Sequence, residues 1–149
     1  MAYLVDTNVL LRLVNVSDAQ HALASRAVTI LHGQRETLHV TAQNLIEFRN
    51  GATRPLQSNG LGLPPVVAAQ EAAKLEVAFP LLEETPDVYP AWKTLADPVG
   101  AVGKQVHDTR LVAVCHVHNV THILTFNVRD FLRFQNIGPG LVVVDPHTV

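Results

Sequence analysis

Short apolar runs alternate along this chain with segments of helical periodicity. The apolar runs are Ala2–Val5, Leu38–Thr41, Ile123–Phe126 and Leu141–Val144, of which Leu38–Thr41 is the weakest. Most of these runs are continuous and do not alternate with polar residues. They therefore predict strands of a parallel sheet that is covered on both faces.

Between the runs, apolar residues recur at three- and four-residue spacings, which predicts helices. The predicted helices are His21–His32, Gln43–Asn50, a segment from Pro64 to Phe79, Pro86–Ala96 and Gln105–His118. We expect Ser17 or Asp18 to cap the first helix and Gly51 to end the second. Pro64 and Pro65 are suited to open the third helix. A further helical segment follows the first strand directly.

The alternation of strands and helices is typical of an α/β domain. Glycine and proline mark two predicted loops, residues 51–65 and residues 98–103. The chain contains neither a recognisable linker nor an internal repeat, and 149 residues suit one core. We therefore expect a single domain over residues 1–149.

Composition excludes several classes of protein. Hydrophobic residues make up 48% of the chain, which excludes wholesale disorder. The 11 basic and 13 acidic residues give a formal charge of −2, which argues against nucleic-acid binding through a general basic field. Local binding, or binding through a bound cation, stays open. The single Cys115 excludes a disulfide framework and is expected to be a buried thiol. With neither a signal peptide nor a membrane-spanning run, we expect a cytoplasmic protein.

Two aspartates directly follow predicted strands. Asp6 ends the first strand and precedes Thr7, and Asp130 comes shortly after Thr125 at the end of the third strand. In an open α/β sheet, ligands bind at the carboxyl ends of the strands, so both carboxylates could face one crevice if the two strands are neighbours. Taken alone, each aspartate could equally cap a helix or turn.

Two further acids lie in predicted helices. Glu47 is flanked by apolar residues, and Asp108 occupies the first turn of the helix Gln105–His118, where the helix dipole favours an acid. Each alone is consistent with a solvated helix face. The four acids Asp6, Glu47, Asp108 and Asp130 together are more informative, because like charges about 4 Å apart repel by roughly 4 kcal/mol at an effective dielectric of about 20. A divalent cation removes this penalty, and oxygen ligands favour Mg²⁺ or Mn²⁺ over zinc.

These residues, in this order, resemble a known family. The segments that carry the resemblance are Val5–Asn8, Asn44–Phe48, Val106–Ala113 and Ile123–Phe131. In them the chain is similar to PIN-domain ribonucleases of the VapC toxin type. The resemblance implies a three-layer α/β/α sandwich around a mainly parallel sheet. It also implies a homodimer and a small antitoxin protein as partner. The apolar stretch from Val66 to Phe79 could be ordinary core or, by the resemblance, a homodimer face or a groove for the antitoxin.

The resemblance implies that Asp6, Glu47, Asp108 and Asp130 form an acidic metal site for hydrolysis of RNA phosphodiester bonds. Many members of the family carry an aspartate where this chain has Asn127, whose amide could coordinate a metal or a phosphate. Thr7 and Thr125 could orient the ligands by hydrogen bonds. Candidate cations for holding RNA are Arg12, Arg49, Arg54, Lys104 and Arg110.

A non-catalytic RNA- or protein-binding module on the same fold is the main alternative, because the acids could serve only as caps. An aspartyl-phosphate phosphatase is disfavoured by Asn8, which stands where such an enzyme carries a second acid, and a receiver domain by the lack of a lysine after Lys104. The eight histidines lack a zinc-type arrangement and are expected to have structural or solvated roles. Trp92 is expected to serve in a core or an interface rather than to stack on bases.

Overall fold

The computed structural model describes residues 1–149 and contains one five-stranded sheet in the order β3-β2-β1-β4-β5, with every neighbouring pair parallel. Its strands are β1 (Ala2–Val5), β2 (Thr37–Thr41), β3 (Leu81–Leu82), β4 (His122–Leu124) and β5 (Val142–Val144). The predicted parallel sheet is confirmed. The edge strand β3 was not predicted, because two residues are too few for a recognisable apolar run.

Seven α-helices surround this sheet. They are α1 (Thr7–Val14), α2 (His21–Gly33), α3 (Ala42–Thr53), α4 (Pro65–Ala78), α5 (Val88–Val99), α6 (Gln105–Val117) and α7 (Val128–Phe131). Short 3₁₀ turns lie at Leu56–Ser58, Leu132–Phe134 and Pro146–Thr148. No helix has the length and apolar character that crossing a membrane requires.

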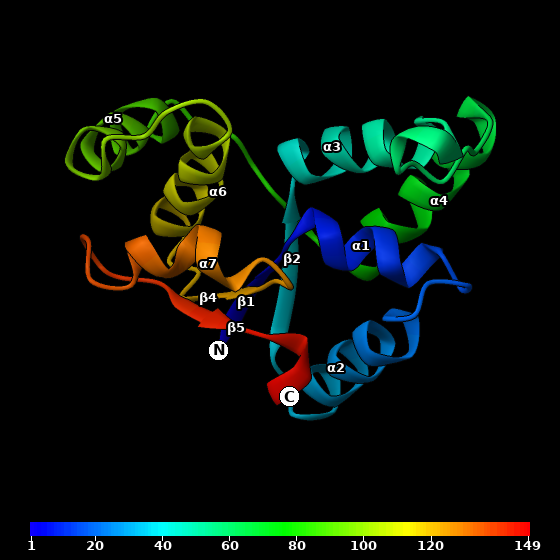
Figure 1. Ribbon diagram of the computed structural model, residues 1–149. Coiled ribbons are helices and arrows are strands. Elements are labelled where there is room, and N and C mark those ends of the chain that lie inside the picture. The colour runs from blue at the N-terminus through cyan, green and yellow to red at the C-terminus, as the bar shows by residue number, and fades with distance from the viewer.

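The sheet separates two layers of helices, as Figure 1 shows, with α1 to α4 on one side and α5 to α7 on the other. The strand β1 shows how the sequence builds both layers. Its residues Tyr3 and Val5 pack into the core with α1 to α4, whereas Leu4 between them packs into the core with α5 to α7. Successive side chains of a strand point to opposite faces, so a continuous apolar run supplies both cores. The expected α/β/α sandwich is confirmed.

Several predicted boundaries were wrong. The helix α3 does not stop at Gly51 but continues to Thr53. Gly51 is instead a packing position, since a Cβ there would lie 2.8 Å from Leu11 Cδ1 on α1. The helix α5 runs through Pro98, which lies inside its last turn, so the loop begins two residues later than predicted.

Other differences concern helix and strand ends. Neither Ser17 nor Asp18 caps α2, whose N-cap is Gln20 without a side-chain hydrogen bond. The strand β4 ends at Leu124, which leaves Thr125 and the next residue outside the sheet. Cys115 is fully buried, as expected.

The register of the central strands determines where the candidate site lies. The strands β1 and β4 are neighbours, with Val5 paired to Leu124. The backbone N–H of Asp6 donates to the carbonyl of Leu124 at 3.0 Å. Residues that follow these two strands therefore meet at the same carboxyl edge of the sheet.

Candidate active site

The four acids singled out from the sequence line one cleft of about 330 Å³. Asp6 lies at the end of β1, whereas Glu47, Asp108 and Asp130 lie on α3, α6 and α7. The polar and charged residues that line the cleft are Asp6, Thr7, Asn8, Glu47, Arg54, Lys104, Asp108, Asn127 and Asp130. The fold thus brings together groups that are separated by more than a hundred residues in the sequence.

Asp6 lies at the base of this cleft and is 6% exposed. Its Oδ1 accepts a hydrogen bond from the backbone N–H of Thr7 at 2.8 Å, which makes Asp6 the N-cap of α1. Its Oδ2 accepts bonds from the hydroxyl of Thr125 at 2.7 Å and from the amide of Asn8 at 2.9 Å. Burial raises the pKa of Asp6 to about 6 against the lowering effect of these bonds, and the charges of Glu47 and Asp108 add to the rise.

Glu47 is fixed by both of its carboxylate oxygens. Oε2 accepts a bond from the hydroxyl of Thr7 at 2.8 Å, and Oε1 accepts one from the amide of Gln43 at 2.7 Å. Gln43 lies one helical turn before Glu47 on the same face of α3. The carboxylate is therefore held in place from α1 and from its own helix.

Asp108 and Asp130 lie on the side of the cleft that α6 and α7 form. The Nζ of Lys104 is 3.4 Å from Oδ2 of Asp130. Burial raises the pKa of Asp108; Lys104 lowers it, and the charges of Asp130 and Glu47 raise it further. Although burial lowers the pKa of Lys104, the charges of Asp108 and Asp130 raise it overall. The lysine is thus protonated and offsets part of the negative charge of the cleft.

The two threonines named from the sequence both contact carboxylates. Thr125 is fully buried and bonds to Asp6, and it also accepts a bond from the backbone N–H of Asn127 at 3.0 Å. Asn127 itself is exposed on the wall of the cleft, and its side chain makes no hydrogen bond within the protein.

The donor set suits a hard divalent cation, but the acids do not converge on one point. No group of three or more His, Cys, Asp or Glu side chains is arranged to hold a metal ion directly. Mg²⁺ is commonly bound through one or two carboxylates and keeps several waters, so it does not require such a group. The buried carboxylate of Asp6, with two acidic neighbours that disfavour its charge, is where a cation would lower the free energy most.

The five candidate RNA-binding cations do not share one location. Arg54 and Lys104 line the cleft. Arg12 is engaged within the protein, where its guanidinium lies 4.7 Å from the ring centre of Phe126 and donates to Gln20 at 2.6 Å. Arg49 is exposed outside the cleft, and Arg110 lines a second cavity.

Three amides contribute to the site although the sequence did not single them out as site residues. Asn8 donates to both Asp6 and Thr125, and Gln43 holds Glu47. Asn44 donates to the hydroxyl of Thr7 at 3.2 Å. Their spacing from the acids carried a usable signal, because Gln43 and Asn44 stand four and three residues before Glu47 on one helix face.

Comparison with known proteins identifies the fold. Residues 3–137 match the model of the PIN domain. No curated protein matches the chain significantly. The solved structure of VapBC2 from Rickettsia felis, bound to a promoter DNA fragment, is similar with a TM-score of 0.71 and 14% identity over 97% of this chain and 98% of that chain.

Two further solved structures are similar to this chain in fold. VapBC-1 from nontypeable Haemophilus influenzae gives a TM-score of 0.71 at 16% identity, covering 99% of both chains. Mycobacterium tuberculosis VapC20, described as a toxin that cleaves the sarcin-ricin loop, gives 0.57 at 20% identity over 81% of this chain and 86% of that chain. At these identities the likeness concerns the fold, and it bears out the resemblance to proteins of the VapC type. Because the PIN model spans nearly the whole chain, from the first strand through Asp130, the last of the four cleft acids, this protein belongs to the PIN domain family.

Proposed function

We propose that this protein is a metal-dependent endoribonuclease and the toxin component of a toxin–antitoxin pair. One observation carries the proposal. Four carboxylates from distant parts of the chain, Asp6, Glu47, Asp108 and Asp130, line one cleft at the carboxyl edge of the sheet. Gathering four acids costs free energy unless a cation is present, so such a cleft favours Mg²⁺ or Mn²⁺.

Asp6 and Asp108 are the proposed direct ligands, with Glu47 and Asp130 binding a second ion or acting through water. When bound, the ion supplies the positive charge that activates a water molecule and stabilises the phosphate during hydrolysis. The protein supplies the orientation, since Thr7 holds Glu47 and Thr125 holds Asp6. Asn127 stands at the rim, where it can bind a metal ion or a phosphate oxygen.

RNA is the proposed substrate. The formal charge of −2 rules out a broad basic surface, so the strand must be held locally. Arg54 and Lys104 are cations on the wall of the cleft and are suited to phosphate contacts. The description of VapC20 as a toxin that cleaves a ribosomal RNA loop supports RNA as the substrate class.

A small antitoxin protein is the proposed partner, and a homodimer the proposed assembly. The similar VapBC structures and a toxin–antitoxin complex from Klebsiella pneumoniae support the antitoxin. On the helix α4, Val66 is 65% exposed and Val77 is 88% exposed. These apolar side chains are available to a partner on the predicted contact face from Val66 to Phe79. We place the protein in the cytoplasm, where RNA and antitoxin are both present. Sedimentation at micromolar concentration tests the dimer.

The non-catalytic alternative has one observation in its favour, because Asp6 does cap α1. Cleavage of RNA decides between the two. The assay compares the wild type with Mg²⁺, the wild type with EDTA, and Asp6→Asn. Asp97→Asn, an exposed acid on α5, serves as the matched control.

We expect cleavage by the wild type and by Asp97→Asn with Mg²⁺, and none with EDTA or in Asp6→Asn. Cleavage that persists through both changes contradicts the metal-dependent mechanism. An absence of cleavage under every condition, with unaltered binding of RNA, supports the binding module instead.

A further inference from the structure

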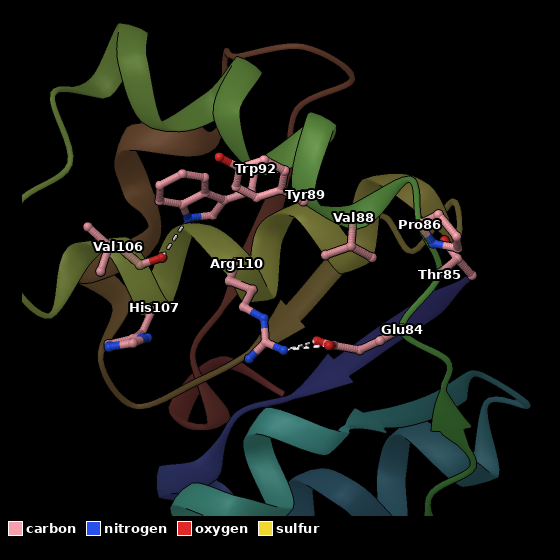
Figure 2. A pocket seen from close by; sticks show the side chains of 9 residues that line it. All are labelled: Glu84, Thr85, Pro86, Val88, Tyr89, Trp92, Val106, His107 and Arg110. Carbon is pink, nitrogen blue, oxygen red and sulfur yellow. Dashed lines mark hydrogen bonds and ion pairs between the residues drawn. The ribbon is translucent and has the colours of Figure 1, made fainter.

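A second cavity, of about 420 Å³, lies beside the acidic cleft between α5, α6 and the segment that follows β3. Figure 2 shows Tyr89 and Trp92 projecting from α5 over α6, with Arg110 and Glu84 joined by an ion pair on the opposite side. The remaining lining residues are Thr85, Pro86, Val88, Val106 and His107. The cavity thus has an aromatic wall and a polar rim.

The aromatic wall is accessible and preorganised. The rings of Tyr89 and Trp92 are nearly parallel, with an angle of 14° and ring centres 6.0 Å apart. The indole N–H of Trp92 donates to the carbonyl of Val106 at 2.8 Å, which fixes that ring against α6. Tyr89 is 66% exposed. Trp92 does pack against the core, as the sequence suggested, but it is only partly buried and keeps a place on the cavity wall.

The polar groups of the cavity are connected to the cleft. His107 lines the cavity and the next residue, Asp108, lines the cleft, so their Cα atoms are about 3.8 Å apart. Arg110 donates to Gln43 at 3.4 Å, and Gln43 in turn donates to Glu47 in the cleft. The cavity and the cleft therefore lie against the same part of α6 and are linked through Gln43.

We propose that this cavity is a nucleobase subsite, which holds one unstacked base of the RNA that lies in the acidic cleft. The inference rests on the proposed function, since it takes RNA as the ligand. Single-stranded RNA is recognised by stacking its bases on aromatic side chains and on arginine planes, with hydrogen bonds to the base edges. Tyr89 and Trp92 supply the stacking surface, and Arg110 and His107 supply polar groups on the cavity wall. The subsite would select where along an RNA the protein binds.

Trp92 is the only tryptophan of the chain, so its fluorescence reports directly on the cavity. The experiment titrates the Asp6→Asn protein, which leaves RNA uncut on the proposed mechanism, with a short single-stranded RNA of mixed sequence. An abasic oligonucleotide of the same length and charge separates base stacking from phosphate attraction. Tyr89→Ala in the same background removes half of the aromatic wall at an exposed position. Val16→Ala, between α1 and α2 and outside both the cleft and the cavity, is the matched control.

We expect RNA to quench the fluorescence to saturation, and Tyr89→Ala to weaken its binding roughly tenfold to a hundredfold, the range for loss of one stacked base. Val16→Ala should bind as the parent does, and the abasic oligonucleotide should bind more weakly by a similar factor. Equal binding of both oligonucleotides, or unchanged binding by Tyr89→Ala, overturns the subsite. A fluorescence change that depends on protein concentration without RNA assigns the cavity to a second copy of the chain and also overturns it.

The two proposals fail separately. If the wild type cleaves RNA with Mg²⁺ but Tyr89→Ala cleaves with an unchanged KM, the subsite is wrong and the nuclease stands. If Trp92 responds to RNA bases but no variant or condition gives cleavage, the nuclease is wrong and the base-binding cavity stands.

Discussion

The stability of the metal-free protein should fall as the pH rises through the titration of Asp6. The pKa of this buried carboxyl is raised from 3.8 to about 6 in the folded protein. An acid whose pKa is raised on folding holds its proton more tightly in the folded state, so its contribution is fully present below pH 3.8 and is lost as the pH rises from 3.8 through about 6. A shift of about two units corresponds to roughly 3 kcal/mol.

For a chain of this length, that free energy corresponds to a decrease in Tm of roughly 6–12 °C. The assay is thermal unfolding in EDTA from pH 4 to pH 8, for the wild type and for Asp6→Asn. The variant lacks the titrating group, so the difference between the two curves isolates Asp6 from the other carboxylates. Addition of Mg²⁺ at pH 8 should restore stability to the wild type, by about 2.7 kcal/mol when Mg²⁺ is present at a hundred times its Kd.

The restoring effect of Mg²⁺ should shrink below pH 6, because the ion must displace the proton of Asp6. It should be much smaller in Asp6→Asn at every pH. Parallel pH curves for the two proteins would refute the electrostatic account of the cleft. A Tm that does not respond to Mg²⁺ in either protein would refute the cation site.

Three further substitutions test the groups around the acids. Thr125→Val removes a donor to Asp6 and should weaken Mn²⁺ binding about tenfold to a hundredfold, measured by calorimetry. Asn44→Ala removes the capping box of α3 and leaves the buried N–H of Thr41 without its partner, so it should lower the free energy of unfolding by about 1–3 kcal/mol in a urea titration. Lys104→Met should tighten Mn²⁺ binding, because it removes a cation, and yet weaken RNA binding with a salt dependence reduced by about one phosphate contact.

Each of these expectations can fail in a specific way. Thr109→Val is the control for Thr125→Val, since that buried hydroxyl bonds only to its own helix at the carbonyl of Gln105. If the two threonine variants lose equal metal affinity, the effect comes from the fold rather than from the bond to Asp6. Metal and RNA affinities that change in the same direction in Lys104→Met would contradict its placement between the acids and the substrate.

The sequence predicted the sheet and most helices because their apolar patterns are strong and local. It also placed Asp6 and Asp130 at the carboxyl edge, since both follow predicted strands. That β1 and β4 are neighbours could only be stated as a condition, because strand order depends on packing between distant segments. The structure satisfies that condition through the pairing of Val5 with Leu124.

What the sequence missed depended on contacts between elements. Gly51 looked like a helix end, but close packing against Leu11 explains the glycine and the helix continues past it. Gln43 stands four residues before Glu47, a spacing that brings the two together on a helix, but only the fold shows that Asn8 holds the carboxylate of Asp6. The second cavity was equally hidden, because it arises where α5 meets α6.

The cation itself is the most direct test of the whole account. Crystals grown with Mn²⁺ and measured at a wavelength with strong anomalous scattering from manganese show where the ion binds. We predict an anomalous peak in the cleft between Asp6 and Asp108, which disappears in crystals of Asp6→Asn. An empty cleft at saturating Mn²⁺, or a peak on another part of the surface, would contradict the proposed cation site.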